Sequence, residues 1–215
     1  MTTPKKLDQP PRYWDRLFAP SSCLAMITTV DKEGRPNAAS YGTCTRVHHE
    51  PVYISFTANV GADNANNILA GSDFVVNLPR FTAHDLEKVR IVGLPFAPGI
   101  SELDKAGLTA LPSKLVKPPR IAECPRHFEC QLEWTKEWSG RLMVVGKVVA
   151  ASVDQDCVDT EGYVIWDKVM SAHYCGAPYG GRFVAAYQTL AADMPYEGPE
   201  VEAFLARERA LFKES

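Results

Sequence analysis

Hydrophobic and polar positions alternate strictly in two parts of the chain. Positions 52, 54, 56 and 58 are Val, Ile, Phe and Ala, with Tyr, Ser and Thr between them. Positions 128, 130, 132 and 134 are Phe, Cys, Leu and Trp, with Glu, Gln and Glu between them. A period of two places successive side chains on opposite faces of a strand and is typical of half-buried antiparallel strands. Both segments are therefore predicted strands.

Less regular apolar runs predict the remaining elements. Further strands are expected at 23–30, 37–47, 74–78, 141–153 and 182–187, and helices at 64–70, 82–92, 101–106 and 201–213. Most strands follow one another through short turns, such as the polar stretch 31–36 with its Gly and Pro. Because strands and helices do not alternate regularly, a parallel doubly wound sheet is disfavoured. The pattern predicts a mainly β protein, a closed or nearly closed antiparallel barrel with peripheral helices.

Composition limits the class of protein. The chain has 215 residues, which suggests one domain, and its 46% hydrophobic and 23% charged residues exclude a disordered chain or a coiled coil. A net charge of −3 offers no basic excess to neutralise nucleic-acid phosphates, so no nucleic-acid partner is expected.

Neither export nor membrane insertion is indicated. The first fourteen residues contain two lysines but no apolar run, and no apolar stretch reaches the ~18–20 residues that cross a bilayer. The six cysteines are scattered and form no C-x-x-C pair, so free thiols are expected. We predict a cytoplasmic protein with no membrane partner.

Several common chemistries lack their motifs. The chain has no G-x-G-x-x-G, no P-loop and no G-x-S-x-G sequence. His48 and His49 are adjacent, so on a strand they point to opposite faces and cannot readily hold one ion. We therefore expect no metal site, and no catalytic side chain can be named.

Two segments remain as candidates for binding chemistry. In 57–68 a strand ends, a loop of small residues follows, and a helix begins, an arrangement that can bind an anion with Asn64 and Asn67 as added donors. Asn64 could equally serve only to cap a surface helix. In 37–46 small residues would let another body approach the strand backbone, or would pack closely against a neighbouring strand or subunit.

The order of several motifs carries a family resemblance. The stretches CLAMITTVDKEGRPNAASYGTCTRV, PVYISF, NANNI, DFVVNLP, DKAGLT, LVKPPRIAECP and RLMVVGKVVA follow one another between residues 21 and 187. Together they resemble the flavin reductase-like family of FMN-binding split barrels, which includes the flavoredoxins. The resemblance implies a six-stranded antiparallel split β-barrel that works as a homodimer with FMN in a groove near the subunit interface. With the helical spacing of apolar residues near the end of the chain, we expect an N-terminal extension (1–20), a barrel domain (21–190) and a C-terminal amphipathic helix (191–215).

The resemblance further implies which residues contact FMN. The family's strand that contacts the flavin ring matches Gly42, Thr43, Cys44 and Thr45. Its phosphate loop matches Thr57, Asn59, Ala62, Asn64 and Asn67. Its strand end near the flavin matches Asn77 and Leu78. The implied function is an FMN-dependent oxidoreductase that passes electrons, with NAD(P)H as the expected donor, to free flavin or another acceptor. Two alternatives are an FMN electron carrier fed by a redox protein and a binding module for another planar cofactor such as haem.

Two positions depart from the family pattern. The family commonly has Arg or Lys just before the helix start, where this chain has Val60, Gly61, Ala62 and Asp63. The phosphate would then rely on amides and hydroxyls, or on a cation from elsewhere, such as Arg46, Arg80 or Arg182. Arg141 stands where family members that use a nicotinamide often have His, which favours the carrier alternative.

Overall fold

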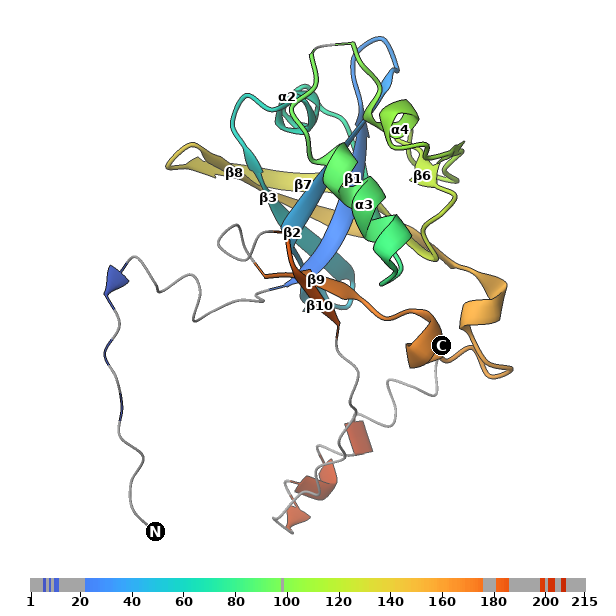
Figure 1. Ribbon diagram of the computed structural model, residues 1–215. Coiled ribbons are helices and arrows are strands. Elements are labelled where there is room, and N and C mark those ends of the chain that lie inside the picture. The colour runs from blue at the N-terminus through green and yellow to red at the C-terminus, as the bar shows by residue number, and fades with distance from the viewer. Residues whose placement is uncertain are drawn as a thin grey trace.

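The computed structural model describes residues 22–97, 99–175 and 181–185, with isolated residues at 6, 8, 10, 11, 198, 199, 201–203, 206 and 207 (Figure 1). The predicted extension 1–20, the C-terminal segment 191–215 and its helix 201–213 lie almost entirely outside the described residues.

Six antiparallel strands close into a barrel. They are β1 (Cys23–Val30), β2 (Pro36–His49), β3 (Val52–Asn59), β4 (Phe74–Leu78), β7 (Arg126–Trp138) and β8 (Arg141–Val153). Neighbours pair in the order β1-β2-β3-β8-β7-β4, and β4 pairs back onto β1, which completes the ring. The predicted fold class, a mainly β six-stranded antiparallel barrel, is confirmed.

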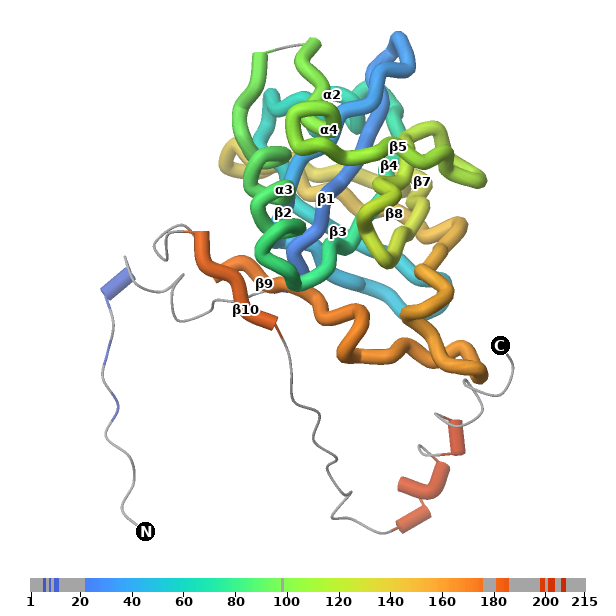
Figure 2. Tube along the Cα trace, turned by 45° about the vertical axis from the view of Figure 1, so that its right-hand side comes forward, coloured from blue at the N-terminus to red at the C-terminus, as the bar shows by residue number. Residues whose placement is uncertain are grey.

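Short elements decorate this barrel. The helices are α2 (Asp63–Leu69), α3 (Ala83–Val92) and α4 (Glu102–Lys105), with 3-10 turns η2 (Gln155–Cys157) and η3 (Trp166–Lys168). The extra strands are β5 (Ala110–Leu111) and β6 (Arg120–Ile121), which pair together, and β9 (Ala172–Tyr174) and β10 (Phe183–Ala185), which extend the main sheet beyond β1. Helices α3 and α4 contact each other and the outside of β2 (Figure 2).

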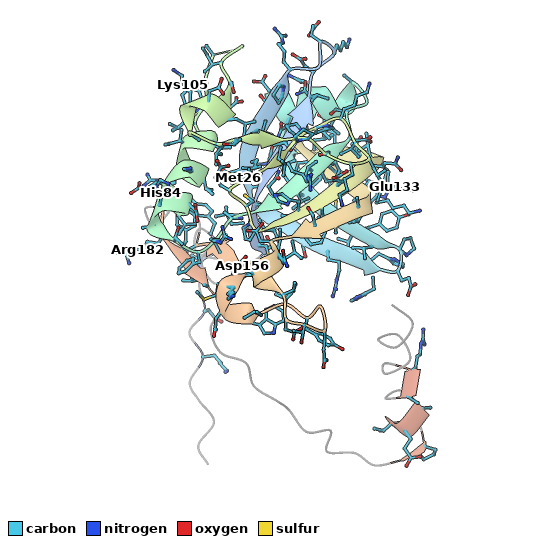
Figure 3. All side chains as sticks on the ribbon, turned by 90° about the vertical axis from the view of Figure 1, so that its right-hand side faces the viewer. Met26, His84, Lys105, Glu133, Asp156 and Arg182 are labelled. Atoms are coloured by element: carbon cyan, nitrogen blue, oxygen red, sulfur yellow. The ribbon has the colours of Figure 1, made fainter. Side chains whose placement is uncertain are left out.

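The apolar side chains form two layers that share β1. Ile27 points into the barrel, where Phe56, Phe74 and Val144 surround the same core. Met26, one residue away, points outward into a second core beneath α3 and α4. Figure 3 shows Met26 between the sheet and the helical side that carries His84 and Lys105, with Glu133 on the far side. Both faces of β1 are thus buried, which explains why its sequence is apolar without alternation.

Local sequence accounts well for where the elements begin and end. Thr82 caps α3 by accepting a hydrogen bond from the backbone N–H of Asp85 at 3.1 Å, as its position three residues before an acidic side chain predicts. The strand over 128–134 is longer than predicted, because β7 pairs with β8 along almost its whole length. The predicted strand 182–187 is present as β10, and its last two residues lie outside the described part.

Two smaller expectations can be checked directly. All six cysteines are free, as predicted. Within the described residues, none of the helices has the length and apolar character that crossing a membrane requires.

Candidate functional site

A buried amide network fixes the start of α2 against the barrel. Asn64, 1% exposed, accepts hydrogen bonds at Oδ1 from the Thr29 hydroxyl and the Asn37 amide, both at 2.7 Å. Its own Nδ2 donates to the Ile27 carbonyl at 3.0 Å, and Asn67 donates to the Thr29 hydroxyl at 2.9 Å. These bonds attach α2 to β1 and β2 and so set the position of the loop that precedes the helix.

A pocket of about 360 Å³ opens beside that loop. Its wall consists of the first half of β2, the end of β3, the loop and start of α2, the end of α3 with the segment after it, and the first residue of α4. The lining residues are Asn37, Ala38, Ala39, Tyr41, Asn59, Gly61, Ala62, Asp63, Asn64, Val92, Gly93, Leu94, Pro95, Phe96 and Glu102. The volume is within the range of small-molecule sites. A second pocket of about 420 Å³ shares Asn37 and Asp63 with it, so the two adjoin.

Small residues shape the pocket. Ala38 and Ala39 contribute small side chains to the β2 wall. Gly93 lets the end of α3 approach β2, because a Cβ at this position would lie 2.6 Å from the Ser40 hydroxyl oxygen.

Two carboxyl groups make the pocket acidic. Glu102 is only 7% exposed, and its Oε2 accepts a hydrogen bond from the Ala38 backbone N–H at 3.5 Å. With its amide turned, Asn37 donates to the same oxygen at 3.3 Å in place of its bond to Asn64. Burial raises the pKa of Glu102, and repulsion from Asp63 adds to that rise.

The start of α2 has no side-chain cap. The first N–H groups of a helix have no acceptor within the helix. The N-terminal cap of α2 is Ala62, and no side chain bonds there, whereas Thr82 and Ser101 cap α3 and α4. Uncapped N–H groups beside a pocket suit an oxyanion. The uncapped donors and a pocket of small-molecule size therefore suit an FMN molecule, although the two carboxylates oppose its phosphate.

The structure gathers one part of the predicted site at this pocket. Asn59, Ala62 and Asn64 line it, and Asn67 lines the adjoining pocket. The amide nitrogens of Asn64 and Asn67 each already donate a hydrogen bond within the protein. Their main role in the described fold is thus to position the loop.

A second part of the predicted site lies on the outer face of β2 and β3. Thr57 donates to the Thr43 hydroxyl through its backbone N–H and its own hydroxyl, both at 3.0 Å. Thr45 is exposed on the same strand, opposite Ser55. Gly42 lies under β9, because a Cβ there would be 3.2 Å from the Cβ of Tyr174.

The third part is enclosed in the protein interior. Cys44 is 4% exposed, and burial raises the pKa of its thiol to about 12, so it stays protonated. Asn77 is fully buried; it donates to the Met26 carbonyl at 3.1 Å and accepts from the Ile121 N–H at 2.8 Å. Leu78 belongs to the barrel core. None of these three lines either of the two pockets.

Comparison with known proteins places the chain in a family. Residues 20–173 match the model of the flavin reductase like domain, which is most of the chain. The chain belongs to the flavin reductase-like family. The resemblance found in the order of its motifs is therefore confirmed.

Solved structures of similar fold include known flavoproteins. The 2-nitrobenzoate 2-nitroreductase NbaA of Pseudomonas fluorescens is 26% identical, with a TM-score of 0.73 over 90% of this chain and 95% of that one. Flavoredoxin of Desulfovibrio vulgaris (Miyazaki F) is 20% identical, with a TM-score of 0.71 over 81% and 91%. An FMN-binding protein from Thermus thermophilus is 17% identical, with a TM-score of 0.67 over 89% and 100%.

Sequence reasoning missed part of the pocket of this flavin reductase-like protein. Glu102 and the segment 92–96 line it and were not predicted, and Tyr41 was predicted only as part of the segment 37–46. The small-residue character of 37–46 was a usable signal for the β2 wall. No signal in the sequence pointed to Glu102, because its contact with Ala38 joins positions 64 residues apart.

Proposed function

We propose that this protein is an FMN-dependent oxidoreductase of the flavin reductase type. It takes electrons from NAD(P)H and passes them to free flavin or another small acceptor. The observation that carries the proposal is the pocket between β2, the uncapped start of α2 and the segment 92–96, in a chain of the flavin reductase-like family. Bound FMN supplies reversible hydride and electron chemistry that no side chain possesses.

The chain's own residues bind and orient the cofactor. Ala39 of β2 would face the flat ring system, and the first N–H groups of α2 would donate to the phosphate. The choice of FMN is supported by the similar Thermus thermophilus protein, which is named for binding it. The NbaA likeness supports transfer to a small molecule.

Tyr41 supplies a proton-bearing group at the pocket wall. Burial raises the pKa of Tyr41 to about 12, so its hydroxyl remains protonated at neutral pH. Its ring packs against Phe56 with the ring centroids 4.8 Å apart, which holds the side chain in place. A fixed phenol can orient a polar edge of a ligand by hydrogen bonding without changing its own charge.

A homodimer belongs to the same proposal. The outer face of the barrel bears a broad depression of about 560 Å³ that includes Val47, Tyr53, Trp134 and Val145. Two of these large apolar side chains are nearly half exposed, Val47 at 48% and Trp134 at 46%. Covering this face with a second copy would also bring the partner close to Thr43 and Thr45, which lie on β2 between Val47 and the pocket at the start of the strand.

The electron donor is tested by anaerobic reduction. Protein loaded with FMN is mixed with NADH or NADPH, and the loss of flavin colour is followed. We expect rapid bleaching with at least one nucleotide. Bleaching by dithionite but by neither nucleotide would contradict the reductase proposal and favour the alternative, an FMN carrier fed by a redox protein, which the Arg at position 141 motivates.

A further inference from the structure

The proposed flavin pocket contains no cation to balance a phosphate. None of the described residues lining it is Lys or Arg, whereas Asp63 and Glu102 both contribute carboxyl groups. An anionic ligand would meet repulsion from both, and this repulsion is strong where water is partly excluded. A positively charged group next to the pocket is therefore needed if a phosphorylated ligand is to be retained.

Arg141 stands at the rim of the pocket. It is the first residue of β8 and pairs directly with Asn59, the last residue of β3. Its Nη1 donates to Oδ1 of Asn59, which lines the pocket. The adjoining backbone is joined as well, because the Val60 N–H donates to the Gly140 carbonyl at 3.0 Å. The guanidinium is therefore held beside the loop that leads into α2, and Arg141 is an exposed residue.

The other arginines near this region are less suitable. Arg35 borders the adjoining pocket, but it pairs with Asp31 at 2.6 Å and with Glu33 at 3.2 Å. Arg80, a candidate from the sequence, pairs with Asp154 at 2.6 Å. Arg46, another candidate, lies opposite Ile54, five residues before the end of β3 that reaches the pocket. Arg141 contacts the pocket wall, and none of the described ion pairs gives Arg141 an acidic partner.

We propose that Arg141 is the phosphate-binding cation of this protein and makes the site selective for a phosphorylated flavin over riboflavin. The inference rests on the proposed flavin site. Guanidinium presents several N–H donors in one plane, a geometry that matches phosphate oxygens. Arg141 thereby replaces the basic residue that the family commonly has just before the helix, where this chain has Gly61 and Ala62.

Binding constants for FMN and riboflavin, measured by flavin fluorescence quenching, test the role of Arg141. The variants are Arg141→Gln and, as a control on the same β-hairpin, Lys136→Gln, which removes one exposed positive charge. We expect Arg141→Gln to weaken FMN binding about ten-fold or more and to leave riboflavin binding unchanged. The control should bind both ligands as the wild type does. Arg141→Lys should restore part of the lost FMN affinity.

Different failures of this experiment have different meanings. If Arg141→Gln binds FMN as tightly as the wild type, or loses affinity for FMN and riboflavin equally, Arg141 does not bind the phosphate. The proposed flavin site is not contradicted by either result. Wild-type protein that binds neither ligand would contradict the flavin site and the role of Arg141 together. Because Arg141 is exposed, the variant should unfold at the same temperature as the wild type, which excludes misfolding as the cause.

Discussion

Glu102 is the residue whose charge the fold controls most clearly near the pocket. Its carboxyl is largely removed from solvent, and burial raises its pKa, with Asp63 adding to the effect. A raised pKa means that the folded protein binds the proton more tightly than the unfolded chain does. The folded state is therefore most favoured below the ordinary carboxyl pKa, and that contribution is lost as the pH rises through the raised value.

The substitution Glu102→Gln removes this pH dependence. At pH 8 the variant should melt above the wild type, because Gln leaves no charge to be held away from water. Near pH 4 the two should melt together, because Glu102 is then protonated in both states. Melting curves across pH 4–8 measure the difference. Glu133→Gln, on the far side of the barrel (Figure 3), is the control and should show no such trend.

A variant that melts below the wild type at pH 8, or by the same margin at every pH, would contradict the account of Glu102. The first result would mean that the charged carboxylate stabilises the fold through its bond to Ala38. The second would mean that packing, and not charge, decides the effect.

Among the elements, β8 and β4 depend on one close approach inside the barrel. Gly146 of β8 faces Phe74 of β4, and a Cβ at Gly146 would lie 2.4 Å from the Phe74 ring. Phe74 is fully buried and meets Phe56 edge-on, with ring centroids 5.2 Å apart, so the ring has little room to move. The glycine is therefore a packing requirement of the barrel.

The substitution Gly146→Ala should lower the free energy of unfolding by about 1–3 kcal/mol, the usual effect of overpacking a core. Urea denaturation measures it. Phe74→Leu gives a smaller side chain, so the double variant should lose less stability than the sum of the two single losses. Additive losses would show that Gly146 and Phe74 do not meet as described.

The elements show how far local sequence can predict a structure. The bounds of β1, β4 and β8 follow from apolar runs and the residues that end them. Closure of the barrel does not follow from local sequence, because the pairing of β1 with β4 joins segments some fifty residues apart. The site shares this limit. A helix start with Asn64 was predictable, but the bonds that occupy its amide come from Ile27 and Thr29, more than thirty residues away.

At the scale of the whole molecule, the exposed apolar face predicts a dimer. Light scattering after gel filtration should give twice the chain mass of 23.7 kDa. The double variant Val47→Glu with Trp134→Glu should shift the protein toward the monomer, because it places charges in the apolar face. Trp166→Glu, at a Trp that is 68% exposed on η3, is the control and should remain dimeric. A wild type that is monomeric at micromolar concentration would contradict this prediction.

The pocket between β2, α2 and the segment 92–96 is the basis of the whole account, and an FMN titration tests it most directly. Wild-type protein should quench FMN fluorescence saturably at one flavin per chain. Ala39→Phe, which fills the β2 wall of the pocket, should bind at least ten-fold more weakly while keeping the wild-type circular dichroism spectrum. No saturable binding by the wild type, or an Ala39→Phe variant that binds FMN as well as the wild type, would contradict a flavin site at this pocket.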